Sequence, residues 1–228
     1  MSQSFKFGLL VFPQITQLDM TGPLQVFSSL PGAEVHLVWK TTEPVQSDTV
    51  LTITPTTRFA DCPQFDVLCV PGGYGTDALM GDEEVLGFLR AQAAGARFVT
   101  SVCTGSLVLA AAGLLEGRSA ATHWSATEVL PVFGVSVSRE RVCIDGNRIT
   151  GGGITAGIDL GLTVICELVD RRTAEAIQLR MEYNPAPPFN AGSPETAPPE
   201  VVELLQERMK PAKARRLALA EAAAARMR

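Results

Sequence analysis

The alternation of short apolar runs with longer helical segments is the feature that most constrains this chain. Four runs are almost continuous in apolar residues such as Val, Leu and Phe, which is the pattern of strands buried on both faces. These runs span residues 5–12, 34–40, 66–71 and 97–102. Helical patterns separate or follow them at residues 23–30, 83–94 and 104–115. The alternation predicts an α/β fold with a mostly parallel sheet and helices on both faces.

The segment that follows predicts a short antiparallel pair and two more helices. Residues 135–141 and 141–149 form the pair, with Asp145-Gly146-Asn147 as a tight turn. Three glycines at 151–153 then lead into a helix at 155–169, and another helix is expected at 173–181.

The C-terminal part is expected to belong to the same domain. Residues 184–200 contain six prolines, which exclude regular structure. They form either a flexible linker or an ordered arm with Phe189 as its apolar anchor. Residues 199–228 are helical in pattern and too few for a second globular domain. We therefore expect one domain, with an α/β body at 1–183 and an arm plus helix at 184–228. The basic face of that helix, at Lys213, Arg215 and Arg216, is expected to be solvated.

Composition excludes several classes of protein. Of 228 residues, 46% are hydrophobic, which supports a large core. The net charge of −5 disfavours a nucleic-acid binder, which needs a basic field. The longest strongly apolar run, at 107–115, is far short of a membrane span, and residues 7–12 are too short for a secretory signal. Five cysteines without a CxxC pair indicate free thiols in a reducing, cytoplasmic setting.

Cys103 carries the strongest functional signal. A buried strand ends at Val102, a helix begins directly after Cys103, and small residues surround the junction. A strand, a nucleophile and a helix in direct succession form the strained turn called a nucleophile elbow. It points the side chain out at the carboxyl end of the sheet, where open α/β folds bind ligands. The helix start favours a thiolate, the reactive form of cysteine. Cys69, inside a strand, is expected only to pack.

Two further segments end at the same edge of the predicted sheet. Asp19 follows the first strand and can reach Cys103, or it can simply cap a helix that begins near Thr21 or Gly22. A carboxyl bonded to a thiolate carries the shared proton, which raises its pKa. Gly72 and Gly73 follow the third strand; they form either an ordinary tight turn or a loop whose free amides face a ligand.

Six segments of the chain resemble the ThiJ/PfpI superfamily, which has the class I glutamine amidotransferase-like fold. They read LLVFPQITQLDMTGP, VPGGYG, SVCTGSLVLAAAGLL, ATHW, GGGITAGIDLGL and EYNPAPPFNAGSPETAP. LDMTGP and the Pro-rich arm are similar more narrowly to the isocyanide (isonitrile) hydratases. The resemblance implies a flavodoxin-like three-layer sandwich, a homodimer, a nucleophile at Cys103, a carboxylate partner at Asp19 and a catalytic role for Thr104. Protease-like relatives carry a His where Thr104 stands, which weakens a peptidase interpretation.

The remaining candidates surround these three residues. The family loop at Gly72 and Gly73 faces the nucleophile, which raises the expectation of amide donors there. Gly152 precedes a helix start that can supply further donors, and Ile154 can line an apolar pocket. His123 lies either near Cys103 or in the core, and we favour the core. His36 and Asp159 are expected to be structural.

The reaction implied by the resemblance is hydration of an isocyanide to an N-substituted formamide through a covalent thioimidate on Cys103. Neither a metal nor an organic cofactor is expected. The alternatives are a glyoxalase-like enzyme, a redox sensor and the ligand-binding domain of a regulator. Glyoxalase-like relatives carry Glu where Asp19 stands, and regulators need a further small domain.

Overall fold

Residues 4–227 are described by a computed structural model of the chain. Its centre is a seven-stranded sheet in the order β10-β11-β7-β6-β1-β2-β5. All neighbours are parallel except β10, which pairs antiparallel with β11. The strands are β1 (Lys6–Leu10), β2 (Glu34–Trp39), β5 (Thr57–Arg58), β6 (Val67–Val70), β7 (Phe98–Val102), β10 (Val142–Asp145) and β11 (Arg148–Gly151). The predicted flavodoxin-like α/β fold is confirmed.

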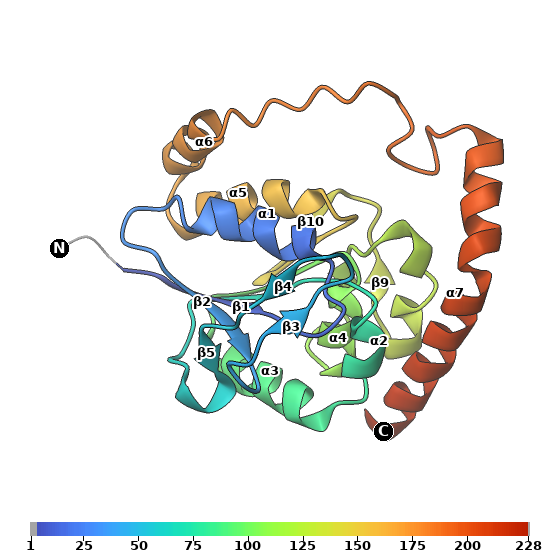
Figure 1. Cartoon of the computed structure of the whole chain (residues 1–228), viewed down its shortest axis with the longest axis horizontal. Coiled ribbons are helices and arrows are strands. Elements are labelled where there is room, and N and C mark those ends of the chain that lie inside the picture. Colours follow the sequence, from blue (N-terminus) through green and yellow to red (C-terminus); the bar gives the residue numbers. More distant parts are fainter. Residues whose placement is uncertain (1–3, 228) are drawn as a thin grey trace.

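Helices cover both faces of this sheet (Figure 1). On one face lie α1 (Gln17–Phe27), α5 (Ala156–Leu168) and α6 (Arg171–Arg180). On the other lie α2 (Thr76–Leu79), α3 (Glu83–Gly95) and α4 (Gly105–Ala111). The buried side chains of β1, β6 and β7 form the core between these layers. Two small two-stranded sheets flank the core: β3 (Val45–Gln46) with β4 (Thr52–Ile53), and β8 (Ser119–Ala120) with β9 (Ser136–Val137).

Among the differences from the sequence prediction, two concern the antiparallel pair and the start of α1. The antiparallel pair is formed by β10 and β11, not by residues 135–141, because β9 pairs with β8 instead. Helix α1 begins at Gln17, six residues before the predicted start at Pro23. Pro23 is tolerated inside the helix where its ring faces Gly157 of α5. A Cβ on Gly157 would lie 2.9 Å from the Pro23 Cδ atom. Close packing of two helices therefore outweighs the proline signal.

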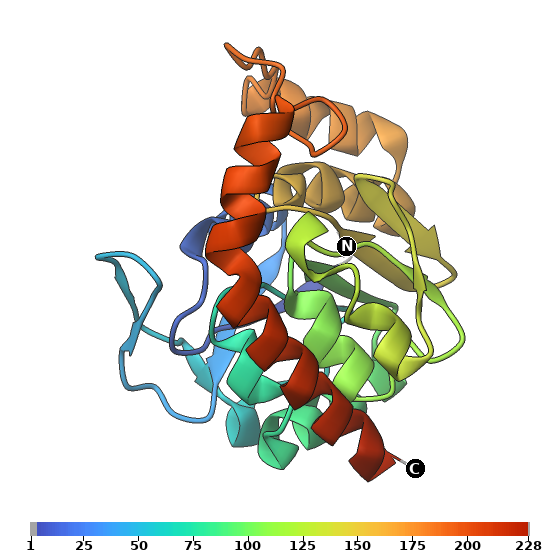
Figure 2. The same ribbon diagram turned by 90° about the vertical axis from the view of Figure 1, so that its right-hand side faces the viewer.

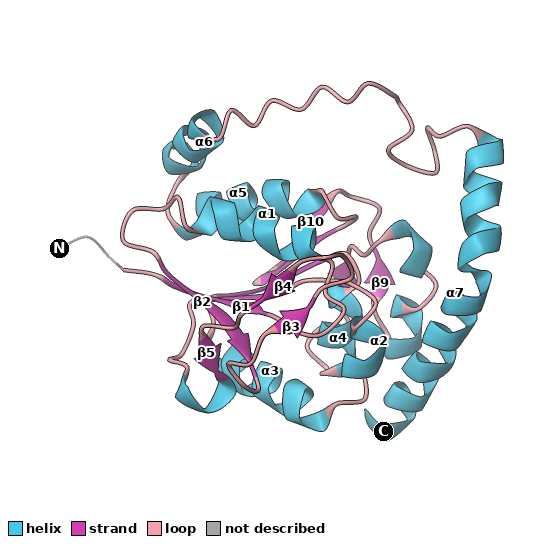
Figure 3. Ribbon diagram, viewed as in Figure 1, coloured by secondary structure: helices cyan, strands magenta, loops and turns pink. Residues whose placement is uncertain are grey.

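The last helix, α7 (Pro199–Met227), lies along the outside of the body (Figure 2). Ala220, Ala223 and Ala224 are buried there. The segment that joins α6 to α7 is drawn as loop throughout, and Phe189 within it is 79% exposed (Figure 3). Phe189 therefore does not anchor the arm to the body of the same chain. Within residues 4–227, no helix combines the length and apolar content that crossing a bilayer requires.

Candidate active site

Cys103 stands at the turn between β7 and α4 in a backbone conformation that is rare for side chains. Its φ is +56°, a left-handed value that costs about 1–2 kcal/mol for a residue with a Cβ. The surrounding chain fixes this turn. The Cys103 N–H donates to the carbonyls of Gly151 (3.1 Å) and Gly152 (2.8 Å), and its carbonyl accepts from the Thr122 hydroxyl (3.1 Å). The predicted elbow is thus present, and Gly152 supports it from the position just after β11.

Asp19 lies inside the first turn of α1, fully buried. The N-cap position belongs to Thr16, so the interpretation of Asp19 as a helix cap is wrong. One carboxylate oxygen, Oδ2, accepts from the Gly72 N–H at 2.9 Å. The other, Oδ1, is buried without a hydrogen-bond partner among the described residues. The carboxyl lies next to Cys103, because a Cβ placed on Gly72 would be within 2.8 Å of both the Asp19 Oδ2 atom and the Cys103 Cβ atom. The ends of β1 and β7 therefore bring the two groups together, as the topology predicts.

Burial controls the ionisation of this pair. It raises the pKa of Asp19 to about 7, although the contacts with Cys103 and Gly72 oppose the shift. Burial also raises the pKa of the Cys103 thiol well above its ordinary value, and the Asp19 charge adds to the rise. The N–H and hydroxyl of Thr104 lower that pKa, but burial outweighs the helix start on which the sequence argument relied. Above about pH 7 the two groups share one proton.

The Gly72-Gly73 loop fits tightly against the pair. A Cβ on Gly72 would lie 2.5 Å from the Asp19 Oδ2 atom and 2.8 Å from the Cys103 Cβ atom. Only glycine fits at this position. The Gly72 amide already donates to Asp19, and the Gly73 amide donates to the Thr104 hydroxyl at 3.1 Å. The expectation that these amides are free donors is therefore wrong; the loop shapes the site.

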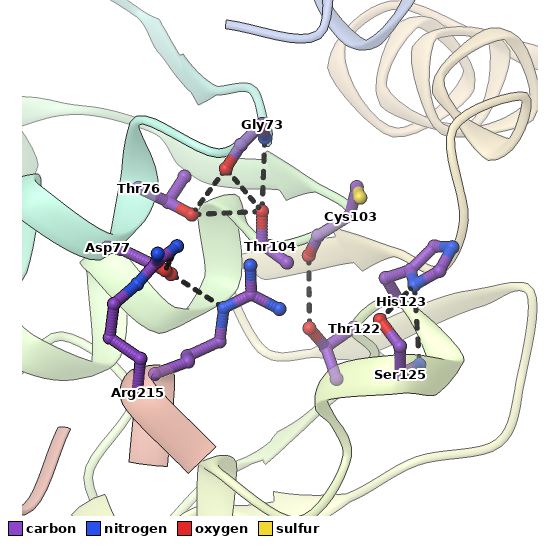
Figure 4. A network of polar contacts seen from close by, with 10 residues as sticks. Gly73, Thr76, Asp77, Cys103, Thr104, Thr122, His123, Ser125 and Arg215 are labelled. Carbon is purple, nitrogen blue, oxygen red and sulfur yellow. Dashed lines mark hydrogen bonds and ion pairs between the residues drawn. The ribbon is translucent and has the colours of Figure 1, made fainter. Parts of the chain in front are cut away.

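Thr104 connects this loop to the elbow. Its Oγ1 also lies 3.3 Å from the Gly73 carbonyl and 3.1 Å from the Thr76 hydroxyl, which itself donates to Gly73 at 2.7 Å (Figure 4). Gly152 is similarly occupied, because its N–H donates to the Arg141 carbonyl at 2.9 Å. The structure thus gives Thr104 and Gly152 contacts that hold the backbone around Cys103.

A cavity of about 180 Å³ opens in front of Cys103. It is lined by Thr16, Asp48, Gly73, Tyr74, Cys103, Thr104, His123, Ser125, Ile154, Met209, Ala212, Lys213 and Arg216. Ile154 lies in its wall, as predicted. Asp19, Gly72 and Gly152 contact the elbow but do not line the cavity.

His123 was expected in the core but lines this cavity. Its Nδ1 lies 2.7 Å from the Ser125 hydroxyl and accepts the Ser125 N–H at 3.3 Å (Figure 4). Burial, with the nearby Arg216 charge, lowers the pKa of His123. The ring is therefore neutral near pH 7 and presents its other nitrogen as a donor. The ATHW motif was the available signal for this residue.

Helix α7 supplies a wall that the sequence analysis missed. Arg216, expected in solvent, is 6% exposed and its Nε donates to Asp77 at 2.6 Å. Arg215 contacts the same carboxylate at 3.2 Å, and Lys213 pairs with Glu128 at 3.1 Å. The prediction of a solvated basic face is therefore wrong for Arg216. The spaced alanines near the end of α7 were the only local sign that this helix packs on the body.

A second, larger cavity of about 980 Å³ adjoins the first and lies between the arm and the body. The arm contributes Gly192 to Glu195, and His123, Ile154 and Lys213 border both cavities. Among residues 4–227, no group of three or more His, Cys, Asp or Glu side chains is arranged to hold a metal ion.

Comparison with known proteins agrees with this geometry. Residues 6–167 match the model of the DJ-1/PfpI family. The isonitrile hydratase of Pseudomonas putida is 55% identical over 224 residues, which cover 98% of each chain. The HTH-type transcriptional regulator GbdR of Pseudomonas aeruginosa is 35% identical over 79% of this chain but only 51% of its own length.

A solved structure is similar as well. The crystal structure of a ThiJ/PfpI family protein from Pseudomonas syringae superposes with a TM-score of 0.93 at 45% identity, covering 96% of this chain and 91% of that one. The resemblance drawn from the motifs is thus confirmed across almost the whole chain. The family match over residues 6–167 and the 55% identity to the isonitrile hydratase show that the chain belongs to the DJ-1/PfpI family.

Proposed function

We propose that this protein is an isocyanide hydratase that converts an isocyanide, R–N≡C, and water into an N-substituted formamide, R–NH–CHO. The observation that carries the proposal is the buried Asp19 carboxyl against the Cys103 thiol, where two groups share one proton above about pH 7. The full-length similarity to the isonitrile hydratase of Pseudomonas putida supports the choice of substrate.

In the first step, the Cys103 sulfur bonds to the terminal carbon of the isocyanide. The thiol proton passes through Asp19 to that carbon, which gives the thioimidate R–N=CH–S–Cys103. A carboxyl with a pKa of about 7 suits this work, because it both takes and returns a proton near neutral pH.

In the second step, water adds across the C=N bond. Asp19 accepts a proton from the water and passes it to the nitrogen, giving R–NH–CH(OH)–S–Cys103 and a free carboxylate. The C–S bond then breaks, the hydroxyl proton returns to sulfur through Asp19, and the formamide leaves. The unpartnered Oδ1 of Asp19 is the oxygen left free to accept and donate the proton in these transfers. The sum of the steps is one isocyanide plus one water.

The cavity suits a small ligand with little charge. Its volume of about 180 Å³ fits a compact group, and Ile154, Met209 and Ala212 give it apolar walls. The limited exposure of Cys103, 6%, argues against a redox sensor, whose thiolate must meet oxidants in solvent.

The test is formamide production from p-nitrophenyl isocyanide by the wild type and by the Cys103→Ala and Asp19→Ala variants. We expect turnover by the wild type and its loss in both variants. A folded wild type that makes no formamide would refute the proposal. Turnover that survives in Asp19→Ala would keep the reaction but remove Asp19 from it.

Three further predictions belong to this proposal. The protein forms a homodimer, acts in the cytoplasm, and folds residues 1–183 and 184–228 as one domain. The burial of Ala220, Ala223 and Ala224 supports the last of these. Light scattering after size-exclusion chromatography measures the oligomeric state, and a single unfolding transition is expected for a single domain.

A further inference from the structure

Arg216 is a buried cation, and contacts within the protein occupy only part of the hydrogen-bonding capacity of its guanidinium. Its side chain is 8% exposed and lines the cavity that contains Cys103. The one hydrogen bond that its guanidinium makes to residues 4–227 is from Nε to Asp77. A guanidinium has five N–H donors, so both terminal nitrogens are left without a protein acceptor. Neither nitrogen is among the buried side-chain atoms that lack a partner, so both keep accessible surface, and in the cavity that Arg216 lines a ligand or water can accept from them.

The charges around Arg216 favour a neutral acceptor over an anion. Asp77, itself 6% exposed, balances the Arg216 charge, and Glu128 balances Lys213. The same cavity is lined by Asp48, whose buried Oδ1 has no partner among the described residues. A carboxylate-bearing ligand would meet that charge, whereas a carbonyl or hydroxyl oxygen would meet only the free donors of Arg216.

The isocyanide group itself brings no oxygen to Cys103, but its hydration creates one. The oxygen appears as a hydroxyl on the carbon bonded to Cys103 and leaves as the formamide carbonyl. A donor that meets this oxygen binds nothing in the substrate and gains its partner only during the reaction. Such an interaction accelerates the chemical step without tightening substrate binding.

We propose that Arg216, delivered by α7, donates hydrogen bonds to the oxygen that hydration adds and is thus a catalytic residue of the isocyanide hydratase reaction. The inference rests on the proposed function and adds to it a wall from outside residues 6–167, the part that matches the family model. Arg215 offers a matched control, because it contacts the same Asp77 carboxylate but does not line the cavity (Figure 4).

The experiment compares Arg216→Lys, Arg216→Met and Arg215→Met with the wild type, using p-nitrophenyl isocyanide as substrate and the corresponding formamide as a product inhibitor. We expect both Arg216 variants to lower kcat about 100-fold, as loss of one oxyanion donor does, with KM nearly unchanged. Inhibition by the formamide should weaken in the same variants. Arg215→Met should keep kcat, KM and formamide inhibition.

Loss of Arg216 also leaves Asp77 buried with a weaker partner, which can unfold the protein. The double variant Asp77→Asn/Arg216→Gln removes both charges together and keeps a neutral polar pair. Thermal unfolding of each variant identifies those that are folded at the assay temperature. A folded double variant with the kcat and formamide inhibition of the wild type would overturn the inference, as would equal losses in Arg215→Met.

The two proposals fail differently. Isocyanide turnover that does not depend on Arg216 removes this inference and leaves the hydratase function standing. If the wild type makes no formamide, formamide binding to the wild type and to the Arg216 variants is measured by thermal shift. Binding that depends on Arg216 then supports its role as an oxygen-binding residue, and binding that is absent or unaffected removes it.

Discussion

Cys69 and Cys103 are both buried thiols, one within β6 and the other just after the neighbouring strand β7, yet only Cys103 is placed for chemistry. Cys69 lies in the middle of β6, opposite Thr100 of β7, and has no exposed surface. Burial raises its pKa to about 12. Cys103 is three residues beyond Thr100, past the end of β7, where the backbone turns to a positive φ and the side chain meets a cavity.

The difference shows that burial alone says little about a cysteine. Both thiols have raised pKa values. What distinguishes Cys103 is a carboxyl partner that can exchange a proton with it and a space in front of it for a ligand. Both follow from its place at the carboxyl end of the sheet, where β1 delivers Asp19 and β6 delivers the Gly72 loop.

The strongest test of this difference is to make the same substitution at both cysteines. Cys103→Ser removes the nucleophile, and we expect formamide production to fall at least about 1,000-fold. Cys69→Ser changes only packing, and we expect full turnover with a loss of about 1–2 kcal/mol in the free energy of unfolding. Turnover assays and urea unfolding on both variants measure this. Equal loss of turnover in the two would contradict the distinction.

Asp19 should make the stability of the protein depend on pH. Because its folded pKa of about 7 lies above the unfolded value near 3.8, the folded state holds its proton more tightly. The stabilisation is complete below about pH 4 and is lost as pH rises towards and through 7. It amounts to a few kcal/mol. Asp19→Asn cannot ionise, so its stability should change less over this range.

Urea unfolding at intervals from pH 4 to pH 8 tests this expectation on the wild type and Asp19→Asn. Parallel curves for the two proteins would mean that Asp19 does not titrate as described.

The Gly72 loop, which follows β6, offers a test of how closely Asp19 and Cys103 must be held together. In Gly72→Ala the new methyl group would press on Asp19 and Cys103, and a shift of either lowers kcat about 10- to 100-fold. Gly152→Ala is the control, because its nearest contact would be the Arg141 carbonyl at 3.7 Å, an ordinary distance. Comparable kinetics for the two variants would show that the crowding at Gly72 has no effect.

Substitution of Thr104 should have the smallest effect on kcat. Thr104→Val leaves the Gly73 N–H without its acceptor, and we expect kcat to fall about 10-fold as the loop loosens. Thr104→Ser keeps the hydroxyl and should retain the activity of the wild type. If Thr104→Ser is as impaired as Thr104→Val, the hydroxyl is not what matters.

The sequence predicts those parts of the site that strands of the central sheet deliver. The elbow at Cys103 follows from where an apolar run ends, and the meeting of strand ends at one edge allows Asp19 to reach it. The pattern left a helix cap equally open for Asp19, and the family resemblance favoured the partner role. Arg216 could not be predicted in this way. It reaches the cavity only because α7 packs back onto the body after a Pro-rich arm, and the spaced alanines near the end of α7 are the only local sign of that packing.

The predicted start of α1 is wrong for a related reason. Pro23 reads as a helix start because its ring disfavours a helix interior. Its acceptance depends on Gly157, more than 130 residues away, whose missing side chain makes room for the ring. Contacts between distant segments thus decide both this helix and the α7 wall of the cavity.

The most direct measurement is to trap the covalent intermediate. The wild type is mixed with p-nitrophenyl isocyanide and quenched with borohydride, which reduces the C=N bond of a thioimidate, and the digested protein is analysed by mass spectrometry. We predict that the peptide containing Cys103 gains the mass of the isocyanide plus two hydrogens, that the Cys69 peptide gains nothing, and that Cys103→Ser shows no adduct. Formamide production by the wild type with an adduct at another residue, or by Cys103→Ser at the wild-type rate, would contradict nucleophilic catalysis by Cys103.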